Sequence, residues 1–320
     1  MDLIHLSIII PTLKCPRTLI RAIESCLNIK NHNVEIIIVI DGPIRGASNF
    51  QKEIPQLPGN FSLVVSAIPR GGAAGARNYG IEKALGNWLF FLDDDDELCA
   101  ENIDLALSYD LVGVDVARGN FLEVRLENDQ LKEDGEESLT LGSSFEVKLT
   151  EPTELFHERG FWRYIYSRNF FHKCGITFFP ERKILNSDYK HEDFFFLCLV
   201  LSSNPKTLVC NLNFYRYYIR QITESDKLAY LEQLLLDINV CKLFISSIRG
   251  RSQFLNKKFL AHVILDRLFF AVNYLFESDV EYSLRNLFSA TIEVVTFCPQ
   301  LMPIACKRLS KQLIKRVLAR

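Results

Sequence analysis

The first hundred residues alternate between short apolar runs and stretches with helical spacing, and this alternation constrains the fold more than any other feature. The apolar runs are residues 6–10, 35–40, 61–65 and 88–92. The stretches with helical spacing are residues 17–28 and 73–85. Strands that are apolar throughout are buried on both faces, which is typical of a parallel sheet covered by helices. The sequence therefore predicts an α/β fold.

Three of the predicted strands end in residues that suit a ligand site. Pro11 and Thr12 follow the first strand, Asp41 follows the second, and the run from Asp93 to Asp96 follows the fourth. In parallel sheets, ligands bind outside the carboxyl ends of the strands. We therefore expect these side chains to lie together at one edge of the sheet.

The densest charge in the sequence is the run WLFFLDDDDEL, residues 88–98. Neighbouring like charges repel one another, so this acidic run after a buried strand requires an explanation. One interpretation is an exposed acidic turn. The other is a Mg²⁺ or Mn²⁺ site, because these hard cations bind carboxylate oxygens and share them with a substrate's phosphates. The apolar strand before the run and the other polar strand ends favour the cation.

The segment PRGGAAGARNYG, residues 69–80, combines glycines with the start of a helix. Glycine permits close backbone approach, and the free N–H groups at a helix start attract an anion. Arg77 lies one turn further on and offers a charged fork. The G-x-G-x-x-G pattern is not matched, so the segment is not a dinucleotide fingerprint.

Composition excludes some classes of protein. The chain has 320 residues and a formal net charge of −2, which argues against a protein that mainly grips nucleic acid. Its nine cysteines are odd in number and never spaced C-x-x-C, so they are interpreted as reduced thiols in a cytoplasmic protein. The polar stretch 119–150 predicts a hairpin with an exposed turn at Asp134 and Gly135.

The last third of the chain predicts a helical region that follows a first domain. We expect a domain over residues 1–226 and helices over 227–320. The final segment, 307–320, has an apolar face and basic residues with no acid among them. One interpretation is a last helix packed on the protein with a solvated basic face. The other is peripheral contact with an anionic membrane surface, because basic residues near such a surface contribute binding energy.

The order of these motifs resembles that of a known family. After the strand-end residues and ARN-x-G (76–80) come FLDDDDEL, W-x-x-I-Y-S-R-N-F (162–170), G-I-T-F-F-P-E (175–181) and HED (191–193). This set is similar to the family 2 glycosyltransferases of the GT-A fold, in particular to bacterial members that assemble surface polysaccharide, capsule and lipopolysaccharide. The resemblance covers roughly residues 5–225. It implies a Rossmann-like, mostly parallel sheet flanked by helices, with a helical C-terminal extension.

The resemblance also implies a role for each matching residue. The residues expected to bind the nucleotide sugar are Pro11, Thr12, Asp41, Arg77, Asp93, Asp94 and Arg220. Those expected to bind Mn²⁺ or Mg²⁺ are Asp95 and Asp96, although the fourth aspartate leaves the register open. Asp193 would be the catalytic base, with Trp162 and Glu192 on the acceptor side. Pro43 departs from the family pattern, which has a small polar residue there.

These roles imply an inverting, metal-dependent transfer of one sugar from a nucleotide sugar, a UDP-hexose, to a glycan or lipid-linked acceptor. The Q-x-x-R-W motif of processive members is absent, which favours a single transfer. We expect a cytoplasmic protein, in peripheral contact with the inner face of the cell membrane through residues 307–320, and no nucleic-acid partner.

Other interpretations of the acidic motifs stay open. An aspartate-nucleophile phosphatase has the pattern D-x-D-x-[TV] on its first strand, whereas here Glu97 takes the last position. A calcium-stabilised binding module of the EF-hand type would need a glycine that D-x-D-x-E lacks. Two acids at a helix start are also ordinary complements to the helix dipole. His191 alone is interpreted as a hydrogen-bonded structural histidine.

Overall fold

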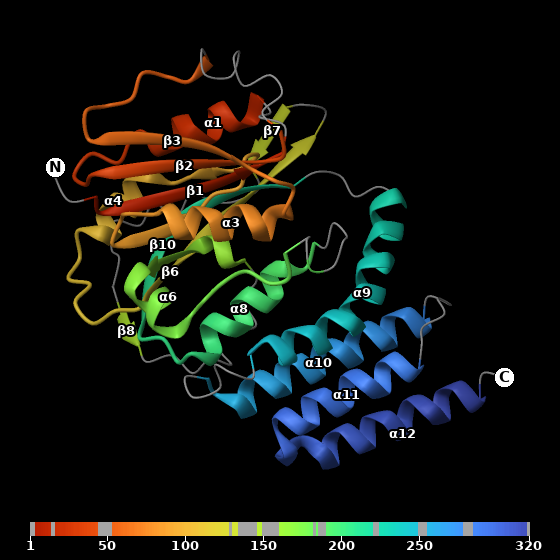
Figure 1. The fold of residues 1–320 in the computed structure, drawn as a ribbon. Helices are drawn as coiled ribbons and strands as arrows, with labels where there is room; N and C mark the ends of the chain where they lie inside the picture. Colours follow the sequence, from red (N-terminus) through yellow and green to blue (C-terminus); the bar gives the residue numbers. More distant parts are fainter. Residues whose placement is uncertain are drawn as a thin grey trace. The chain divides into compact units, whose positions relative to one another are not determined.

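The computed structural model describes residues 4–13, 17–43, 53–127, 130–133, 146–148, 160–181, 184, 190–219, 224–248, 255–277 and 284–318. They form two compact units (Figure 1). The first unit contains the described residues up to 148, those from 160 to 184 and those from 205 to 219. The second unit contains residues 190–204 and the described residues from 224 onward. This grouping differs from the predicted division at 226, because helix α8 (Glu192–Ser202) belongs with the C-terminal helices.

The first unit is built on a parallel sheet, as the apolar runs predict. Strands β3 (Phe61–Ile68), β2 (Val34–Asp41), β1 (Leu6–Thr12) and β4 (Trp88–Phe91) lie side by side and run parallel. Every residue of β1, β2 and β4 is buried. The predicted α/β class is therefore confirmed, and the carboxyl ends of these strands share one edge of the sheet.

The sheet continues beyond β4 with mixed directions. Strand β9 (Tyr164–Ser167) pairs antiparallel with β4 and β6 (Val116–Glu127), and β10 (Thr207–Ile219) runs parallel to β6. The short strand β5 (Glu97–Leu98) closes the series against β10, while β7 (Gln130–Glu133) pairs with β6 and β8 (Glu146–Lys148) with β10. Glu127 pairs with Gln130, so β6 and β7 form an antiparallel pair within the stretch that was predicted as a hairpin. Asp134 and Gly135 themselves lie outside the described residues.

Helices cover both faces of the parallel strands. Helices α1 (Arg17–Cys26) and α4 (Ala100–Leu107) share a buried apolar cluster with the face of β1 that carries Ile8 and Ile10. Helix α3 (Gly72–Lys83) packs on the opposite face, next to Ile9. A Cβ atom at Gly80 would lie 2.4 Å from the side chain of Ile9. The glycine of the ARN-x-G motif is therefore required for close packing of α3 on the sheet.

A buried carboxylate joins α4 to the loop between α1 and β2. Asp104 accepts hydrogen bonds from the backbone N–H groups of Lys30 and Asn31, from the Asn31 side chain at 2.6 Å and from His32 Nδ1 at 2.7 Å. Burial alone would raise the pKa of Asp104, but the hydrogen bond from His32 and those from Lys30 and Asn31 together lower that pKa below its ordinary value.

Asp104→Asn is therefore expected to lower the free energy of unfolding by about 2 kcal/mol near neutral pH, because several donors lose a charged acceptor. The folded-state pKa of Asp104 is lowered, so its contribution is present above the unfolded pKa of about 3.9 and is lost as the pH falls through the folded value. Urea unfolding at a series of pH values measures this difference. Asp110→Asn, at an exposed carboxylate, is the matched control. Equal urea midpoints for the Asp104 variant and the parent near neutral pH would contradict the assignment.

The second unit consists of helices. They are α8, α9 (Glu224–Ile248), α10 (Lys257–Glu277), α11 (Leu284–Phe297) and α12 (Met302–Leu318), with the 3₁₀ turn η3 (Pro299–Leu301) between α11 and α12. A further 3₁₀ turn, η1 (Phe161–Arg163), belongs to the first unit. The expected helical C-terminal region is confirmed. Within the part of the chain that the structure describes, α10 alone is long and apolar enough to cross a membrane, over residues 257–276. Since 56% of that stretch is buried, a core helix explains its composition equally well.

The basic end of the chain is partly engaged within this unit. Arg308 of α12 forms an ion pair with Asp266 of α10 and lies over the ring of Phe269. Lys307 and Lys311 are exposed. The side chains from residue 313 onward lie outside the described part of the chain, so membrane contact through 307–320 stays a prediction.

Candidate active site

Two of the predicted strand-end residues are joined by a hydrogen bond. The Thr12 hydroxyl at the end of β1 donates to a carboxylate oxygen of Asp94, which follows β4. The two residues are 82 positions apart in the sequence. Pro11 is buried within β1 beside Thr12. The carboxyl ends of the strands therefore bring together residues that the sequence marks as parts of one site.

Asp41, at the end of β2, binds the start of helix α3. Its Oδ1 accepts a hydrogen bond from the Gly71 backbone N–H at 2.6 Å, and the residue is buried. Gly42 adopts a φ of +131°, a conformation that favours glycine, and its N–H donates to the Ile68 carbonyl. This geometry gives Asp41 a structural task, and its predicted contact with uracil stays a prediction.

Arg77 holds the first aspartate of the acidic run. Its Nη2 donates to Asp93 Oδ1 at 2.6 Å, and the guanidinium group lies over the rings of Phe161 and Phe178. The neighbouring Asn78 exchanges two hydrogen bonds with the backbone of Phe178. The ARN motif thus fixes both the acidic run and the G-I-T-F-F-P-E segment, two contacts that the sequence alone did not reveal.

Asp96 points into the protein. One of its oxygens accepts from the Tyr215 hydroxyl and the other from the Tyr218 N–H, both at 2.8 Å, and the residue is 2% exposed. Burial, followed by the negative charge of Asp93, raises the pKa of Asp96 to about 8. Both oxygens bind strand β10, so Asp95 is the better candidate of the two predicted metal ligands.

Arg21 and Tyr218 fix the end of the acidic run, and sequence reasoning missed both. Arg21 of α1 donates to the Asp95 carbonyl oxygen and binds Glu97 at 3.0 Å. The Tyr218 hydroxyl donates to Glu97 at 2.7 Å, and its ring lies 3.9 Å from the Arg21 guanidinium carbon. Partners this distant in sequence leave no local signal.

Trp162 belongs to an aromatic cluster beside the acidic run. Its ring stacks on Tyr215, at 4.4 Å between centroids, and on Tyr217, at 5.2 Å. Phe121 contacts it edge to face. The Tyr215 hydroxyl also accepts from the Asp93 N–H, so this cluster is continuous with the acidic run. The predicted place of Trp162 on the acceptor side stays a prediction.

The remaining predicted residues lie elsewhere in the chain. Glu192 and Asp193 form the first turn of α8 in the second unit, where Glu192 is buried and Asp193 is exposed. Asp193 Oδ1 accepts from the Phe194 N–H at 2.7 Å. Arg220 lies outside the described residues. The roles of these three residues stay predictions.

The acidic run offers suitable donors for a hard cation. Among the described residues, no group of three or more His, Cys, Asp or Glu side chains is arranged to hold a metal ion. Asp93, Asp94 and Asp95 are partly exposed and carry carboxylate oxygens at the sheet edge. Mg²⁺ is typically bound through one or two carboxylates with substrate phosphates completing its coordination. The residues therefore fit a cation that binds together with a diphosphate.

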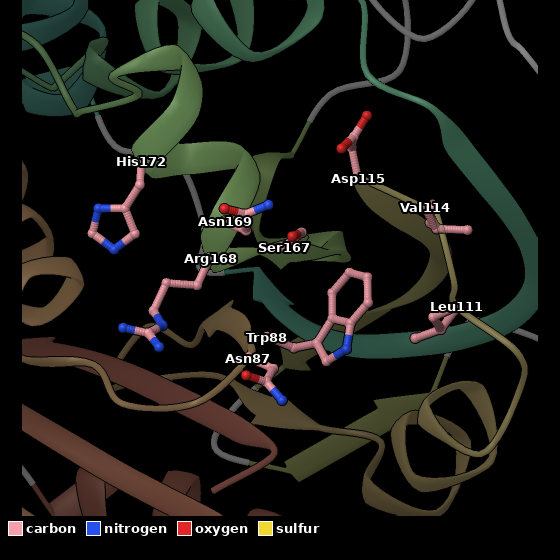
Figure 2. Close-up of a pocket in the computed structure, with 10 residues that line it drawn as sticks. Asn87, Trp88, Leu111, Val114, Asp115, Ser167, Arg168, Asn169 and His172 are labelled. Carbon is pink, nitrogen blue, oxygen red and sulfur yellow. The ribbon is translucent and has the colours of Figure 1, made fainter.

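A separate hollow lies at the opposite edge of the sheet (Figure 2). It has a volume of about 420 Å³, and its lining includes Asn87, Trp88, Asp115, Arg168 and His172. It lies where β4 begins and β9 ends, since Trp88 pairs with Ser167. None of the residues with a predicted role lines it, although Ser167, Arg168 and Asn169 of the motif W-x-x-I-Y-S-R-N-F do.

Known proteins share this sequence pattern and this architecture. An uncharacterised glycosyltransferase of Haemophilus influenzae is 32% identical over 133 residues, covering 41% of this chain and 53% of that protein. The succinoglycan biosynthesis protein ExoO of Rhizobium meliloti is 26% identical over 211 residues, covering 64% of this chain and 58% of that protein. The chain thus spans little more than half the length of these relatives.

A solved structure extends the comparison to nearly the whole chain. Residues 1–349 of TarS from S. aureus, in complex with UDP-GlcNAc, superpose with a TM-score of 0.66 at 17% identity. The alignment covers 97% of this chain and 89% of that one. At this identity the likeness establishes the fold.

The mixed sheet, with its acidic run at the carboxyl edge, defines an α/β protein of the GT-A fold. The sequence model of "Glycosyl transferase family 2" matches residues 7–172, more than half of the chain. The chain belongs to glycosyl transferase family 2, as the order of its motifs implied.

Proposed function

We propose that the chain is an inverting glycosyltransferase that moves one sugar from a UDP-hexose to a glycan or lipid-linked acceptor in the assembly of a bacterial surface polysaccharide. One observation carries the proposal: the acidic run after β4 is fixed by Thr12, Arg77 and Arg21 at the carboxyl edge of a parallel sheet. An exposed acidic turn needs no such support, whereas a site for a diphosphate and a cation does.

The relatives support this choice of substrates. TarS has been solved with UDP-GlcNAc and with UDP, which favours a uridine nucleotide as the donor. ExoO is named for succinoglycan biosynthesis, and GgaB of Bacillus subtilis, 32% identical over 105 residues, for minor teichoic acid biosynthesis. These names concern the biosynthesis of succinoglycan and of teichoic acid, which favours a glycan or lipid-linked acceptor for this chain.

In the proposed mechanism, the sheet edge binds the donor and Asp193 serves as the base. Asp95, with Asp93 beside it, would hold Mn²⁺ or Mg²⁺. When bound, the cation offsets the charge that develops on the departing diphosphate. Arg77 keeps Asp93 in place through its 2.6 Å contact. Asp193 takes the proton of the acceptor hydroxyl, whose oxygen displaces the nucleotide at the anomeric carbon and inverts its configuration.

A donor screen tests the proposal. The full chain is incubated with UDP-, GDP- and dTDP-sugars in the presence of Mn²⁺, Mg²⁺ or EDTA, and slow release of free nucleotide is followed. We expect release from one or a few UDP-sugars, with little release in EDTA. Water takes the place of the acceptor in this assay, so the acceptor need not be known.

Three outcomes would contradict the proposal in whole or in part. Release of inorganic phosphate from nucleotide sugars or phosphoesters would favour the aspartate-nucleophile phosphatase. Calcium binding without binding of any nucleotide would favour a non-enzymatic binding module. Release of nucleotide from GDP- or dTDP-sugars alone would be consistent with a glycosyltransferase but would overturn the proposed uridine donor.

A further inference from the structure

A buried charge cluster holds the residue that precedes α8, and the proposed mechanism does not use it. His191 Nδ1 lies 3.2 Å from both carboxylate oxygens of Asp237 in α9 and 2.6 Å from Nη2 of Arg267 in α10. Arg267 Nη2 also binds Asp237 Oδ2 at 2.7 Å. The side chain of Asp237 is fully buried. All three residues belong to the second unit.

The imidazole ring of His191 is held from two helices. A guanidinium group can only donate hydrogen bonds and an ionised carboxylate can only accept them, so the tautomer of His191 decides whether Nδ1 accepts from Arg267 or donates to Asp237. Asp237 is paired with Arg267 in either tautomer. The cluster therefore joins the residue that precedes α8 to both α9 and α10.

Other contacts hold the residues on both sides of Glu192 and Asp193. The Lys190 N–H donates to Gln233 of α9 at 2.8 Å. The His191 ring contacts Tyr230 of α9, and the Arg267 guanidinium lies over the ring of Phe194. The first turn of α8 is therefore held against α9 and α10 on both sides of its acidic pair.

The start of α8 has no side-chain N-cap hydrogen bond. His191 is the N-cap residue of α8, and its side chain makes no cap hydrogen bond to the helix. N-cap side chains ordinarily accept from the second or third helical N–H. The His191 side chain instead reaches α9 and α10, so interhelical contacts set the direction in which α8 begins.

We propose that His191, Asp237 and Arg267 are positioning residues that fix the first turn of α8 and thereby aim Asp193 at the acceptor hydroxyl. This inference rests on the proposed function, in which Asp193 is the base. Stability alone does not require such a cluster, because apolar residues of similar volume often replace a buried ion pair without loss of stability. Hydrogen bonds and ion pairs are directional, so they orient the start of a helix better than apolar packing does.

The test uses substitutions that separate orientation from stability. The double variant Asp237→Leu with Arg267→Met removes both charges together, which avoids an unpaired buried charge. His191→Asn places an amide group near the position of Nδ1, where its oxygen can accept from Arg267 or its nitrogen can donate to Asp237, whereas His191→Leu removes both contacts. Glu293→Gln is the matched control, since Glu293 of α11 accepts a hydrogen bond from Ser246 of α9, a contact between helices that does not involve α8.

Three quantities are measured for each full-length variant: the thermal unfolding midpoint, hydrogen exchange of the peptide spanning 190–198, and nucleotide release from the fastest UDP-sugar of the donor screen. We expect the double variant and His191→Leu to unfold near the parent temperature and to exchange faster at 190–198. Their kcat should fall by roughly 10- to 100-fold at unchanged donor KM, because a small misplacement of a reacting group has effects of this size. His191→Asn and Glu293→Gln should resemble the parent.

The outcomes distinguish this inference from the proposed function. If Asp193→Asn is inactive while the double variant and His191→Leu keep the parent kcat and exchange rate, the positioning role is overturned and the function stands. If exchange at 190–198 rises but neither these variants nor Asp193→Asn changes nucleotide release, the cluster fixes the helix start and Asp193 is not the base. If the double variant and His191→Leu lose kcat without losing stability, and His191→Asn keeps the parent kcat, both the positioning role and the proposed function are supported.

Discussion

Asp193→Asn is expected to lower the rate of sugar transfer by roughly 10²–10⁴-fold while donor and metal binding survive. Asparagine keeps the shape of the side chain and removes its basicity, so only the proton transfer should suffer. The structure strengthens the choice between the two acids, because Asp193 is exposed and Glu192 is buried. The side chains of adjacent helical residues point about 100° apart, so only one of these two acids can face the acceptor.

Glu192→Gln provides the matched comparison for this prediction. We expect it to retain turnover, since the side chain is directed into the protein. Steady-state kinetics with the preferred donor, and calorimetry with UDP and Mn²⁺, measure the two effects separately. Normal turnover in Asp193→Asn together with an inactive Glu192→Gln would reverse the roles. Normal turnover in both would exclude a base at the start of α8.

Asp95→Ala is expected to abolish Mn²⁺-dependent binding of UDP and to leave the fold intact. Asp95 lies in the loop after β4, is partly exposed and contributes little to the core. Loss of a direct ligand should weaken metal-dependent binding by more than the roughly 10- to 100-fold that loss of an outer-shell partner causes. Calorimetric titration of UDP with and without Mn²⁺ measures the effect, and circular dichroism checks the fold.

Asp96→Asn tests the register of the acidic run. Asp96 binds Tyr215 and the Tyr218 backbone, so its replacement should disturb the contact with β10 and leave metal-dependent UDP binding largely in place. If Asp96→Asn abolishes that binding and Asp95→Ala does not, the ligand assignment is shifted by one residue. Undiminished binding in both variants would remove the metal site from this run.

Local pattern was sufficient to predict half of the sheet. The strands β1, β2 and β4 are buried at every position and mostly apolar, because helices cover both faces of the sheet. Such strands can be recognised without reference to the rest of the chain. The position of the site followed from the same pattern, since strand ends of a parallel sheet share one edge. Thr12 and Asp94 were predicted together for this reason.

The other half of the sheet depends on pairings that no local pattern carries. Strand β9 lies between β4 and β6 through the pairs Trp88–Ser167 and Val116–Tyr166, which join segments far apart in sequence. The supports of the acidic run have the same character. Arg21 lies 74 residues from Asp95, and Tyr215 lies 119 residues from Asp96, so neither could be assigned before the topology was known.

The chain contains two tryptophans, Trp162 in the 3₁₀ turn η1 and Trp88 at the start of β4. Trp162 stacks on Tyr215, whose hydroxyl binds both Asp93 and Asp96, whereas Trp88 lines the hollow shown in Figure 2. Indole emission responds to charge and polarity in the immediate surroundings of the ring. The fluorescence of Trp162 should therefore report on the acidic run, while that of Trp88 provides a reference signal away from it. Trp88→Phe and Trp162→Phe would assign the two signals without any attached dye.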